Sequence, residues 1–465
     1  MVARPSSLPV TRQIASIARA SACSRTPSVL VCRRTAAPPS SPRPAWVRST
    51  ANDSRKLLVT KTKLSQPAPD VRRARIAVAV LFLTNGALFA NVVPRYPGIK
   101  DALSLDNAAY GLGIAAFPAG AILAGLAAAT IIRRLGSARA AVFGTILTAI
   151  GTVLVGFSPS FPLFAAALFF AGAMDSITDV GQNTHGLRVQ RRFGRSIINS
   201  FHAVWSVGAV LGGGMAAGAI ALGLPPAVHL SISGTLFAVV SVVALRYCLP
   251  GKDEDAGLTA NPVGTETTST LRSALSPRLI IMVAALVVIA IAGTLVEDAG
   301  STWAAVYLGN NLGAPAAIAA TGFIALVGAQ FIGRLLGDGL VDRFGQRAVA
   351  RAGGLITAVG MGTALLFPTI PGTIAGFAAA GFGVATLVPA AMQQADELPG
   401  LRAGTGVTVV SWLMRLGFLV SPPLVGLIAD NSSLRFGLLV VPIAGLLAFA
   451  LAGVLTNTRK SSGTA

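Results

Sequence analysis

Ionisable residues inside apolar stretches are the first sign of chemistry in this sequence. Asp175, Glu297 and Arg415 each lie within a long, mostly apolar run. A charge at the centre of a bilayer costs about 2.5–3.5 kcal/mol on insertion scales, so it needs a partner or an aqueous cavity. Arg415 suits an anionic group of a solute, or a carboxylate that gains and loses a proton. The alternative for Arg415 is a permanent ion pair that locks two helices together.

Two aspartates recur at helical spacing in the fourth apolar run. Asp175 and Asp179 are four residues apart, as are Asp179 and Asn183, so all three share one helix face. Asp175 lies deeper in the run, and we expect it to line a solute or proton pathway. Asp179 lies nearer the end, where a gate ion pair with a loop residue such as Arg133 or Arg134 is the favoured interpretation.

The seventh apolar run carries two adjacent carboxylates. Glu297 and Asp298 point about 100° apart on a helix, so they cannot both face one cavity squarely. We expect Glu297 to load and release a proton, whereas Asp298 can simply reach the outer surface. Trp303 can stack on a sugar-like ring or belong to the interfacial aromatic belt, and the belt is the favoured interpretation.

A second group of charges predicts a gate. Arg334 and Asp338 are four residues apart and can pair within one helix. Together with Asp342 and Arg343, they are expected to form an inner gate cluster. This cluster is interpreted as a structural switch more than as a binding site.

Uncharged polar residues complete the candidate pathway. Asn85 and Gln393 suit a solute that carries hydroxyl or amide groups, or plain hydrogen bonds between helices. The sequence has no Gly-Lys-Ser/Thr phosphate-binding motif, no His/Cys metal spacing and no Gly-x-Ser-x-Gly elbow. We therefore expect no cofactor, no metal and no enzymatic activity, and an ion gradient must supply any driving force.

The elements that position these residues are membrane helices. Hydrophobic residues make up 53% of the chain and charged residues 12%, about half the charged share of a soluble domain. Twelve apolar segments are about 20 residues or longer, enough to cross a hydrocarbon core of about 30 Å. They span residues 76–94, 107–132, 138–157, 161–183, 200–222, 227–249, 279–305, 315–340, 348–367, 372–393, 404–427 and 435–456.

The basic residues set the expected orientation. Met1–Ile76 holds 15 Lys and Arg against two Asp and Glu, so most of the net charge of +20 lies there and does not indicate a nucleic-acid partner. Beyond Ile76, seventeen Lys and Arg fall in loops on one side, and only Arg95, Lys100 and Arg435 fall on the other. Because basic loops stay in the cytoplasm, we expect both chain ends to be cytoplasmic.

We expect five segments along the chain. Residues 1–70 form a disordered basic extension, which is either an organellar transit peptide or, as we favour, the result of a start site placed too far upstream. A six-helix bundle covers 75–249, a cytoplasmic linker 250–277, a second six-helix bundle 278–457 and a cytoplasmic tail 458–465.

A repeat relates the two halves. An offset of 209 residues places Gly136 on Gly345, each in a short loop that follows the second helix of its half. The same offset places Gly172 on Gly381, and Gly208 on Gly417. All three pairs fall in matching helices, which predicts two pseudo-symmetric bundles.

The loop from Gly337 to Gly345 resembles the signature of the major facilitator superfamily, although Asp338 stands at its usual first glycine and Arg133 replaces the aspartate of the first-half copy. Further stretches resemble the bacterial YbjJ-like branch, close to fucose-permease-like carriers. They are Asp179–Asn183, Ser200–Ala203, Glu297 with Trp303, and Leu419–Pro423.

This resemblance implies a twelve-helix secondary transporter that works by alternating access. The expected cargo is a small solute that is sugar-like, a metabolite or drug-like, and the expected coupling ion is the proton. We expect a monomer in a bacterial inner membrane, with an organellar membrane as the alternative location. A membrane sensor or scaffold that does not transport is the alternative function.

Overall fold

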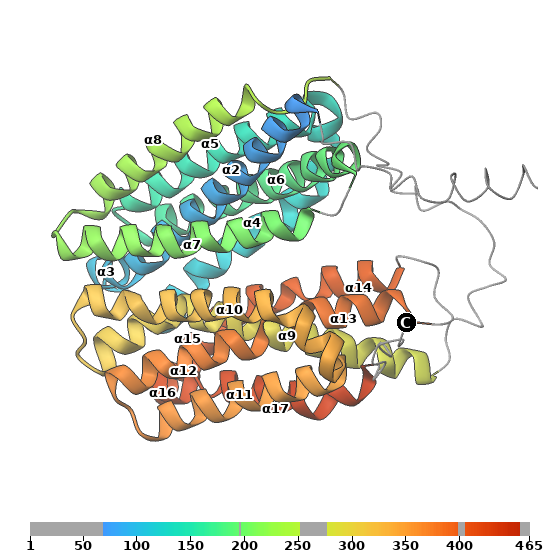
Figure 1. Ribbon diagram of the computed structural model, residues 1–465. Coiled ribbons are helices and arrows are strands. Elements are labelled where there is room, and N and C mark those ends of the chain that lie inside the picture. The colour runs from blue at the N-terminus through green and yellow to red at the C-terminus, as the bar shows by residue number, and fades with distance from the viewer. Residues whose placement is uncertain (1–67, 195–196, 252–276, 399–404, 456–465) are drawn as a thin grey trace, which may run out of the picture. The chain divides into compact units, whose positions relative to one another are not determined.

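Twelve helices are long and apolar enough to cross a bilayer in the computed structural model of this protein. The structure describes residues 68–194, 197–251, 277–398 and 405–455 (Figure 1). The prediction of an all-helical membrane protein with twelve spans is confirmed. Most of the predicted extension, linker and tail lies outside the described residues, which all belong to the unit Gln66–Ala465.

The first six spans form one bundle. Its elements are α2 (Pro69–Val92), η2 (Val93–Arg95), α3 (Tyr96–Ala102), α4 (Asn107–Leu135), α5 (Ser137–Gly156), α6 (Phe161–Phe193), α7 (Ile198–Ala221) and α8 (Pro226–Leu245). Inside the bundle α2 packs on α7, and α6 packs between α4 and α5. The first span is long because α2 continues through η2 and α3.

The last six spans form the second bundle, and three of them are broken. Its elements are α9 (Pro277–Val306), η3 (Tyr307–Asn311), α10 (Ala316–Phe344), α11 (Gln346–Leu366), α12 (Ile370–Val384), α13 (Leu387–Asp396), α14 (Thr405–Leu413), α15 (Arg415–Asn431), α16 (Leu434–Gly437), α17 (Val440–Leu451) and η4 (Ala452–Val454). The two bundles meet where α4 packs on α15 and where α7 packs on α10.

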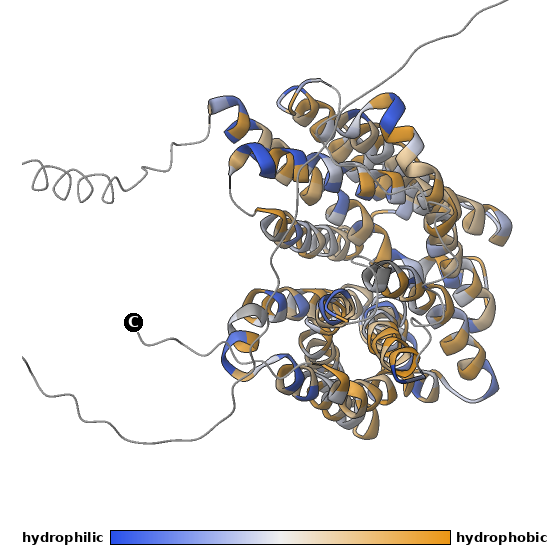
Figure 2. Cartoon of the chain, turned by 90° about the vertical axis from the view of Figure 1, so that its right-hand side faces the viewer, coloured by the Kyte–Doolittle hydropathy of each residue, from blue (hydrophilic) through white to orange (hydrophobic). Residues whose placement is uncertain are grey.

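The outward-facing side chains suit lipid. Leu126, Leu222 and Phe367 each expose about three quarters of their surface, which would be costly in water. In the view along the helices of Figure 2, hydrophobic segments predominate, and the hydrophilic segments lie mainly at helix ends that face the viewer. This distribution indicates a chain whose helices are surrounded by hydrocarbon.

Two loop glycines show that the bundles repeat one backbone geometry. Gly136 has φ 84° and ψ 149°, and Gly345 has φ 85° and ψ 152°, a region that residues with a side chain rarely enter. Gly136 N–H donates to Ile132 O, and Gly345 N–H donates to Val341 O, both at 2.8 Å. Each donor and each acceptor is related by the 209-residue offset, so the repeat expected from the sequence is confirmed here.

A second glycine pair repeats a contact between helices. A Cβ on Gly172 would meet the carbonyl of Phe117, and a Cβ on Gly381 would meet the carbonyl of Leu326. Phe117 and Leu326 are also 209 residues apart. Glycine is therefore required at both positions, because the fourth span crosses the second at the same point in each bundle.

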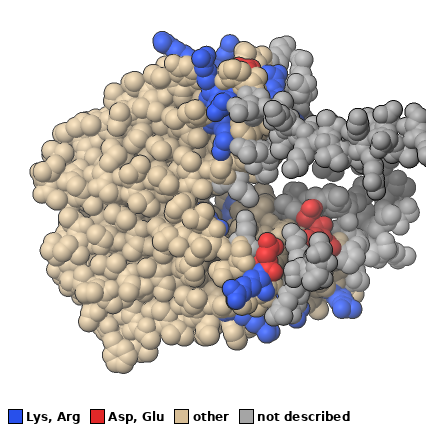
Figure 3. Space-filling view, viewed as in Figure 1, with Lys and Arg blue, Asp and Glu red and all other residues tan. Residues whose placement is uncertain are grey.

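The charged residues gather at one end of the helices, as Figure 3 shows at its right-hand side. We call this the basic end, because α4, α6 and α8 of the first bundle finish there with Arg133, Arg134, Arg191, Arg192 and Arg246. At the same end, Figure 3 shows the surface hollowed between the two bundles.

Candidate functional site

The first bundle holds a carboxylate that is bound by neutral groups. Asn85 Nδ2 of α2 donates to Asp175 Oδ1 of α6 at 2.5 Å. Trp205 Nε1 of α7 donates to Asn85 Oδ1 at 2.8 Å. Three helices are thus joined by one chain of hydrogen bonds, and Asp175 itself is only partly exposed.

Close contact between α2 and α7 positions this network. A Cβ on Gly86 would meet the carbonyl of Trp205, and a Cβ on Gly208 would meet the carbonyl of Leu83. Only glycine fits at such a close approach. The contact brings the indole of Trp205 to the amide of Asn85, a partner that the sequence alone did not reveal.

The second bundle holds a carboxylate that is bound by a cation and an amide. Gln330 Nε2 of α10 donates to Glu297 Oε2 of α9 at 2.7 Å. Arg334 Nη2, one turn further along α10, lies 3.6 Å from the same oxygen. Arg334 thus has a partner on α9 that its spacing to Asp338 did not indicate. The side chain of Asp338 lies outside what the structure describes, so its gate role stays a prediction.

Arg415 begins α15, directly after a break in the eleventh span. The hydroxyl of Thr294 in α9 donates to the carbonyl of Met414 at 2.9 Å. A side chain inserted beside a helix in this way can interrupt its hydrogen-bond ladder. The sequence predicted Arg415 near the middle of an unbroken helix. The interruption is local, because Met414 keeps right-handed helical dihedral angles and the span continues from Val409 to Asn431, so Arg415 lies within the eleventh span as predicted.

Charges of the two bundles face each other across the interface. Asp179 of the first bundle interacts electrostatically with Arg415 of the second, and His202 interacts with both Asp179 and Arg334. Asp179 also accepts a hydrogen bond from Asn183 Nδ2 at 2.9 Å, as their shared helix face predicted. The printed hydrogen bond of Asp179 lies within its own helix, so its expected ion pair with a loop arginine stays a prediction.

Trp303 is buried, so the favoured assignment to the aromatic belt is wrong. Its ring is 0% exposed and packs edge to face against Tyr110 of α4, with ring centroids 4.9 Å apart. Asp298 does not reach the outer surface either, since its Oδ2 atom is buried without a hydrogen-bond partner among the described residues. Both side chains point into the contact between α9 and the first bundle.

The remaining gate candidates lie at the basic end. Arg133 Nη2 donates to Thr130 Oγ1 at 2.9 Å within its own helix, and Arg343 lies over the ring of Phe344 at 5.3 Å. Arg134 and Asp342 are exposed. All four residues lie on the last turns of α4 and α10, at the basic end. Their role in a gate stays a prediction.

Gln393 lies apart from the other pathway candidates. It accepts a hydrogen bond from Gln346 Nε2 at 2.7 Å and donates to Glu397 Oε1 at 3.1 Å. Both partners belong to the basic end of the second bundle. The structure therefore does not bring Gln393 together with Asp175 or Glu297.

Asp430 and Tyr110 bind the two bundles together at the end opposite the basic end, and the sequence did not predict these contacts. We call them the latch. Asp430 at the end of α15 accepts hydrogen bonds from the backbone N–H groups of Asn107 and Ala108, at 3.0 and 2.6 Å. Tyr110 Oη donates to the carbonyl of Thr302 at 2.8 Å. Asp430 thus supplies acceptors that the first turn of α4 lacks within its own helix. No local sequence signal connects residues 323 positions apart.

The side chains around Asp175 and Glu297 can form hydrogen bonds with a polar solute, and a carboxylate among them can take up and release a proton. Glu297 lies between a cation and an amide, and its side chain is 22% exposed, so it is not sealed in the protein interior. Asp175 and Asn85 offer an acceptor and an amide to a polar solute. Among the described residues no group of three His, Cys, Asp or Glu side chains could hold a metal ion.

Known proteins share both the sequence pattern and the fold. The profile described as Major Facilitator Superfamily matches residues 78–338 and 298–464. The uncharacterised transporter y4wD of Sinorhizobium fredii is 30% identical over 378 residues, which cover 81% of this chain and 97% of that protein.

Two solved structures show the same fold at low sequence identity. The nucleoside transporter NupG has a TM-score of 0.64 at 13% identity, covering 82% of this chain and 98% of that chain. A bacterial homologue of the human lysosomal transporter Spinster, in an inward-facing and unoccupied conformation, has a TM-score of 0.64 at 15% identity. It covers 83% of this chain and 98% of that chain.

Proposed function

Since the chain belongs to the Major Facilitator Superfamily, we propose that it is a secondary transporter that moves a small polar solute by alternating access, coupled to protons. The observation that carries this proposal is the pair of polar networks around Asp175 and Glu297. A scaffold or sensor has no need to keep ionisable groups in the membrane at such a cost. We also propose that the chain belongs to the YbjJ-like branch, which its sequence resembles.

Alternating access is supported by the difference between the two ends. At one end, Asp430 and Tyr110 bind the bundles together. At the basic end, the surface is hollowed between the bundles. We therefore assign the structure to a state in which the central space opens toward the basic end. If basic loops are cytoplasmic, this is an inward-open state in an inner membrane, with both chain ends inside.

Proton coupling is assigned to Glu297. Its carboxylate contacts Gln330 and Arg334 of the neighbouring helix, and its side chain is partly exposed. When the bundles rock, the two helices keep their contact while access to water changes sides. A proton taken up from one side can then be released to the other.

Solute binding is assigned to the space between Asp175 and Arg415. Asn85 and Trp205 fix the carboxylate of Asp175, while Arg415 begins α15 with its charge toward Asp179. Amide, carboxylate and guanidinium groups together suit a solute with several hydroxyl or amide groups. This chemistry fits sugar-like or nucleoside-like metabolites better than an apolar drug.

A counterflow experiment tests the proposal. The purified full chain is reconstituted in liposomes that are preloaded with one unlabelled solute from a panel of sugars, nucleosides and organic acids. Uptake of the same labelled solute above protein-free liposomes is the expected result for at least one class. If no class exchanges, although the protein is folded and inserted, the sensor or scaffold function replaces transport.

A further inference from the structure

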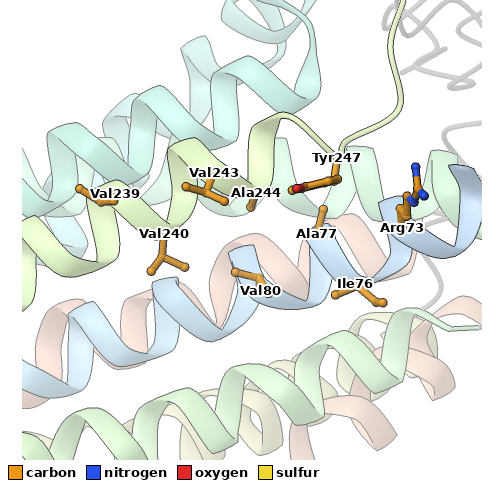
Figure 4. A pocket seen from close by; sticks show the side chains of 9 residues that line it. All are labelled: Arg73, Ile76, Ala77, Val80, Val239, Val240, Val243, Ala244 and Tyr247. Atoms are coloured by element: carbon orange, nitrogen blue, oxygen red, sulfur yellow. The ribbon is translucent and has the colours of Figure 1, made fainter.

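An apolar groove lies on the outside of the first bundle, between α2 and α8 (Figure 4). Its volume is about 460 Å³, within the range of small-molecule sites, roughly 300–1,000 Å³. Aliphatic side chains such as Ile76, Val80 and Val243 line its walls, Arg73 lies at one end, and the hydroxyl of Tyr247 points along the groove away from Arg73. The groove is separate from the polar networks between the bundles.

The groove faces the membrane and not the hollow. Ile76 is 65% exposed and Val243 is 48% exposed. From Arg73 to Val80 the groove follows α2 for about 10 Å, roughly a third of a hydrocarbon core of about 30 Å. A polar solute finds no hydrogen-bond partner along these walls. The length and lining suit the first part of a lipid acyl chain.

The end of the groove carries a cation without a described partner. The side chain of Arg73 is exposed and makes no hydrogen bond or ion pair with any residue that the structure describes. Asp70 lies one turn earlier on α2, and the hydroxyl of Tyr247 lies on the opposite wall. Arg72 and Arg246 are adjacent in sequence to this end, so positive charge prevails there. A guanidinium binds phosphate oxygens with two parallel hydrogen bonds.

We propose that this groove binds one anionic phospholipid from the leaflet at the basic end. Its phosphate contacts Arg73, and one acyl chain follows the groove past Tyr247 toward Val239. A free phosphate would leave the apolar walls exposed. A lipid without net charge would gain less from the basic surroundings of the groove end.

Lipid-dependent stability and native mass spectrometry test this site in the purified full chain. Phosphatidylglycerol and phosphatidylcholine with identical acyl chains are the probes. Phosphatidylglycerol is expected to raise the melting temperature more and to stay bound as one additional adduct. Arg73→Ala should weaken that binding about fivefold, because one basic residue near an anionic lipid contributes about that factor. Arg73→Lys should lie between the two.

Matched variants separate the headgroup from the acyl chain. Arg278→Ala removes an exposed arginine at the matching start of α9 and should leave the preference unchanged. Val243→Trp fills the groove and should remove the adduct, whereas Val242→Trp, beside it but outside the lining, should not. All these positions are exposed, so the variants should fold.

Three results would overturn the proposal. One is an equal preference for phosphatidylglycerol in Arg73→Ala and the unmodified protein. Another is an equal effect of Val243→Trp and Val242→Trp on the adduct. The third is a stabilisation by inorganic phosphate alone that matches that of the lipid, which would indicate a free anion as the ligand.

Discussion

The two bundles share one backbone and differ in their chemistry. Gly136 and Gly345 have the same dihedral angles and the same hydrogen bond. Under the same 209-residue offset, however, Glu297 corresponds to Leu88, and Asp175 corresponds to Val384. The scaffold repeats because each bundle must pack its helices in the same way. The ionisable groups do not repeat, so packing alone does not account for them.

The partners of the two carboxylates differ as well. Asp175 is held by the neutral amide of Asn85, whereas Glu297 is held by Gln330 and the cation of Arg334. A neutral partner can be replaced by a polar solute without leaving a charge behind. A cation remains when its carboxylate takes up a proton, and it then becomes available to another anion. The difference assigns solute binding to the first bundle and coupling to the second.

Glu297→Gln should have the largest effect of the changes that separate these roles. Glutamine keeps the size of the side chain but cannot carry a proton in and out. We expect pH-gradient-driven transport in proteoliposomes to fall to the level of protein-free liposomes, while counterflow persists. Glu397→Gln is the matched control, because Glu397 lies at the basic end and contacts Gln393. Unchanged transport with unchanged dependence on the pH gradient would contradict the assignment of Glu297.

Asp175→Asn should weaken solute binding and leave coupling intact. A hydrogen bond to a charged group contributes about 1.5–3 kcal/mol, so the KM for the solute should rise tenfold or more. Transport at saturating solute should still follow the pH gradient. Asp70→Asn, at the exposed start of α2, should change KM by less than about twofold. A loss of gradient dependence in Asp175→Asn would place coupling in the first bundle.

The sequence predicted helices and repeats better than it predicted partners. Hydrophobic runs located all twelve spans, because a bilayer requires about 20 apolar residues in a row. The break at Met414 was not predicted, since its cause is the hydroxyl of Thr294 in another helix. Trp303 was misplaced for a similar reason, because its burial depends on Tyr110 from the other bundle.

Gln330 is the partner that the sequence came closest to revealing. It precedes Arg334 by four residues and so shares its helix face, a spacing that indicates a common polar site. The latch of Asp430 on α4 had no such signal. Contacts between distant helices depend on how the bundles are placed, and composition and periodicity do not encode that placement in a single sequence.

Arg334→Ala should distinguish coupling from structural locking. The ion pair is partly exposed, with Arg334 at 38%, and such pairs contribute about 0–1 kcal/mol to stability. We therefore expect a small change in the free energy of unfolding. Transport should fall about tenfold, because Glu297 then keeps a charge in the membrane with only an amide partner. Arg351→Ala, which removes an arginine near Phe449, serves as the control.

The opposite outcome for Arg334→Ala would give the ion pair of Arg334 with Glu297 a structural role and not a role in coupling. A large loss of stability with normal transport per folded molecule would mean that it locks α9 to α10. The contacts of Glu297 with Gln330 and Arg334 would then be structural, and coupling would need another group.

Asp430→Ala should have the smallest effect on transport. It changes the equilibrium between conformations and leaves the sites around Asp175 and Glu297 intact. Removing a side chain that accepts backbone N–H groups at a helix start costs about 1 kcal/mol. A free-energy change of this size alters an equilibrium constant about fivefold. Asp430 reaches α4 from the other bundle. We therefore expect Asp430→Ala to destabilise the conformation in which this end is closed.

Asp106→Ala provides the matched control, because Asp106 accepts from Ala109 N–H at 2.7 Å within its own bundle. It should weaken the start of α4 without opening the latch.

Spin labels on cysteines at exposed Ser104 and Ser432, with Cys23 and Cys32 replaced by serine, report the distance across this end by electron resonance. Cys248, which is partly exposed, is replaced by serine as well. A longer distance in Asp430→Ala alone would mean that the bundles separate where their carboxylate bridge was removed. Equal distances in both variants would mean that the packing of α4 on α15 holds this end closed without Asp430.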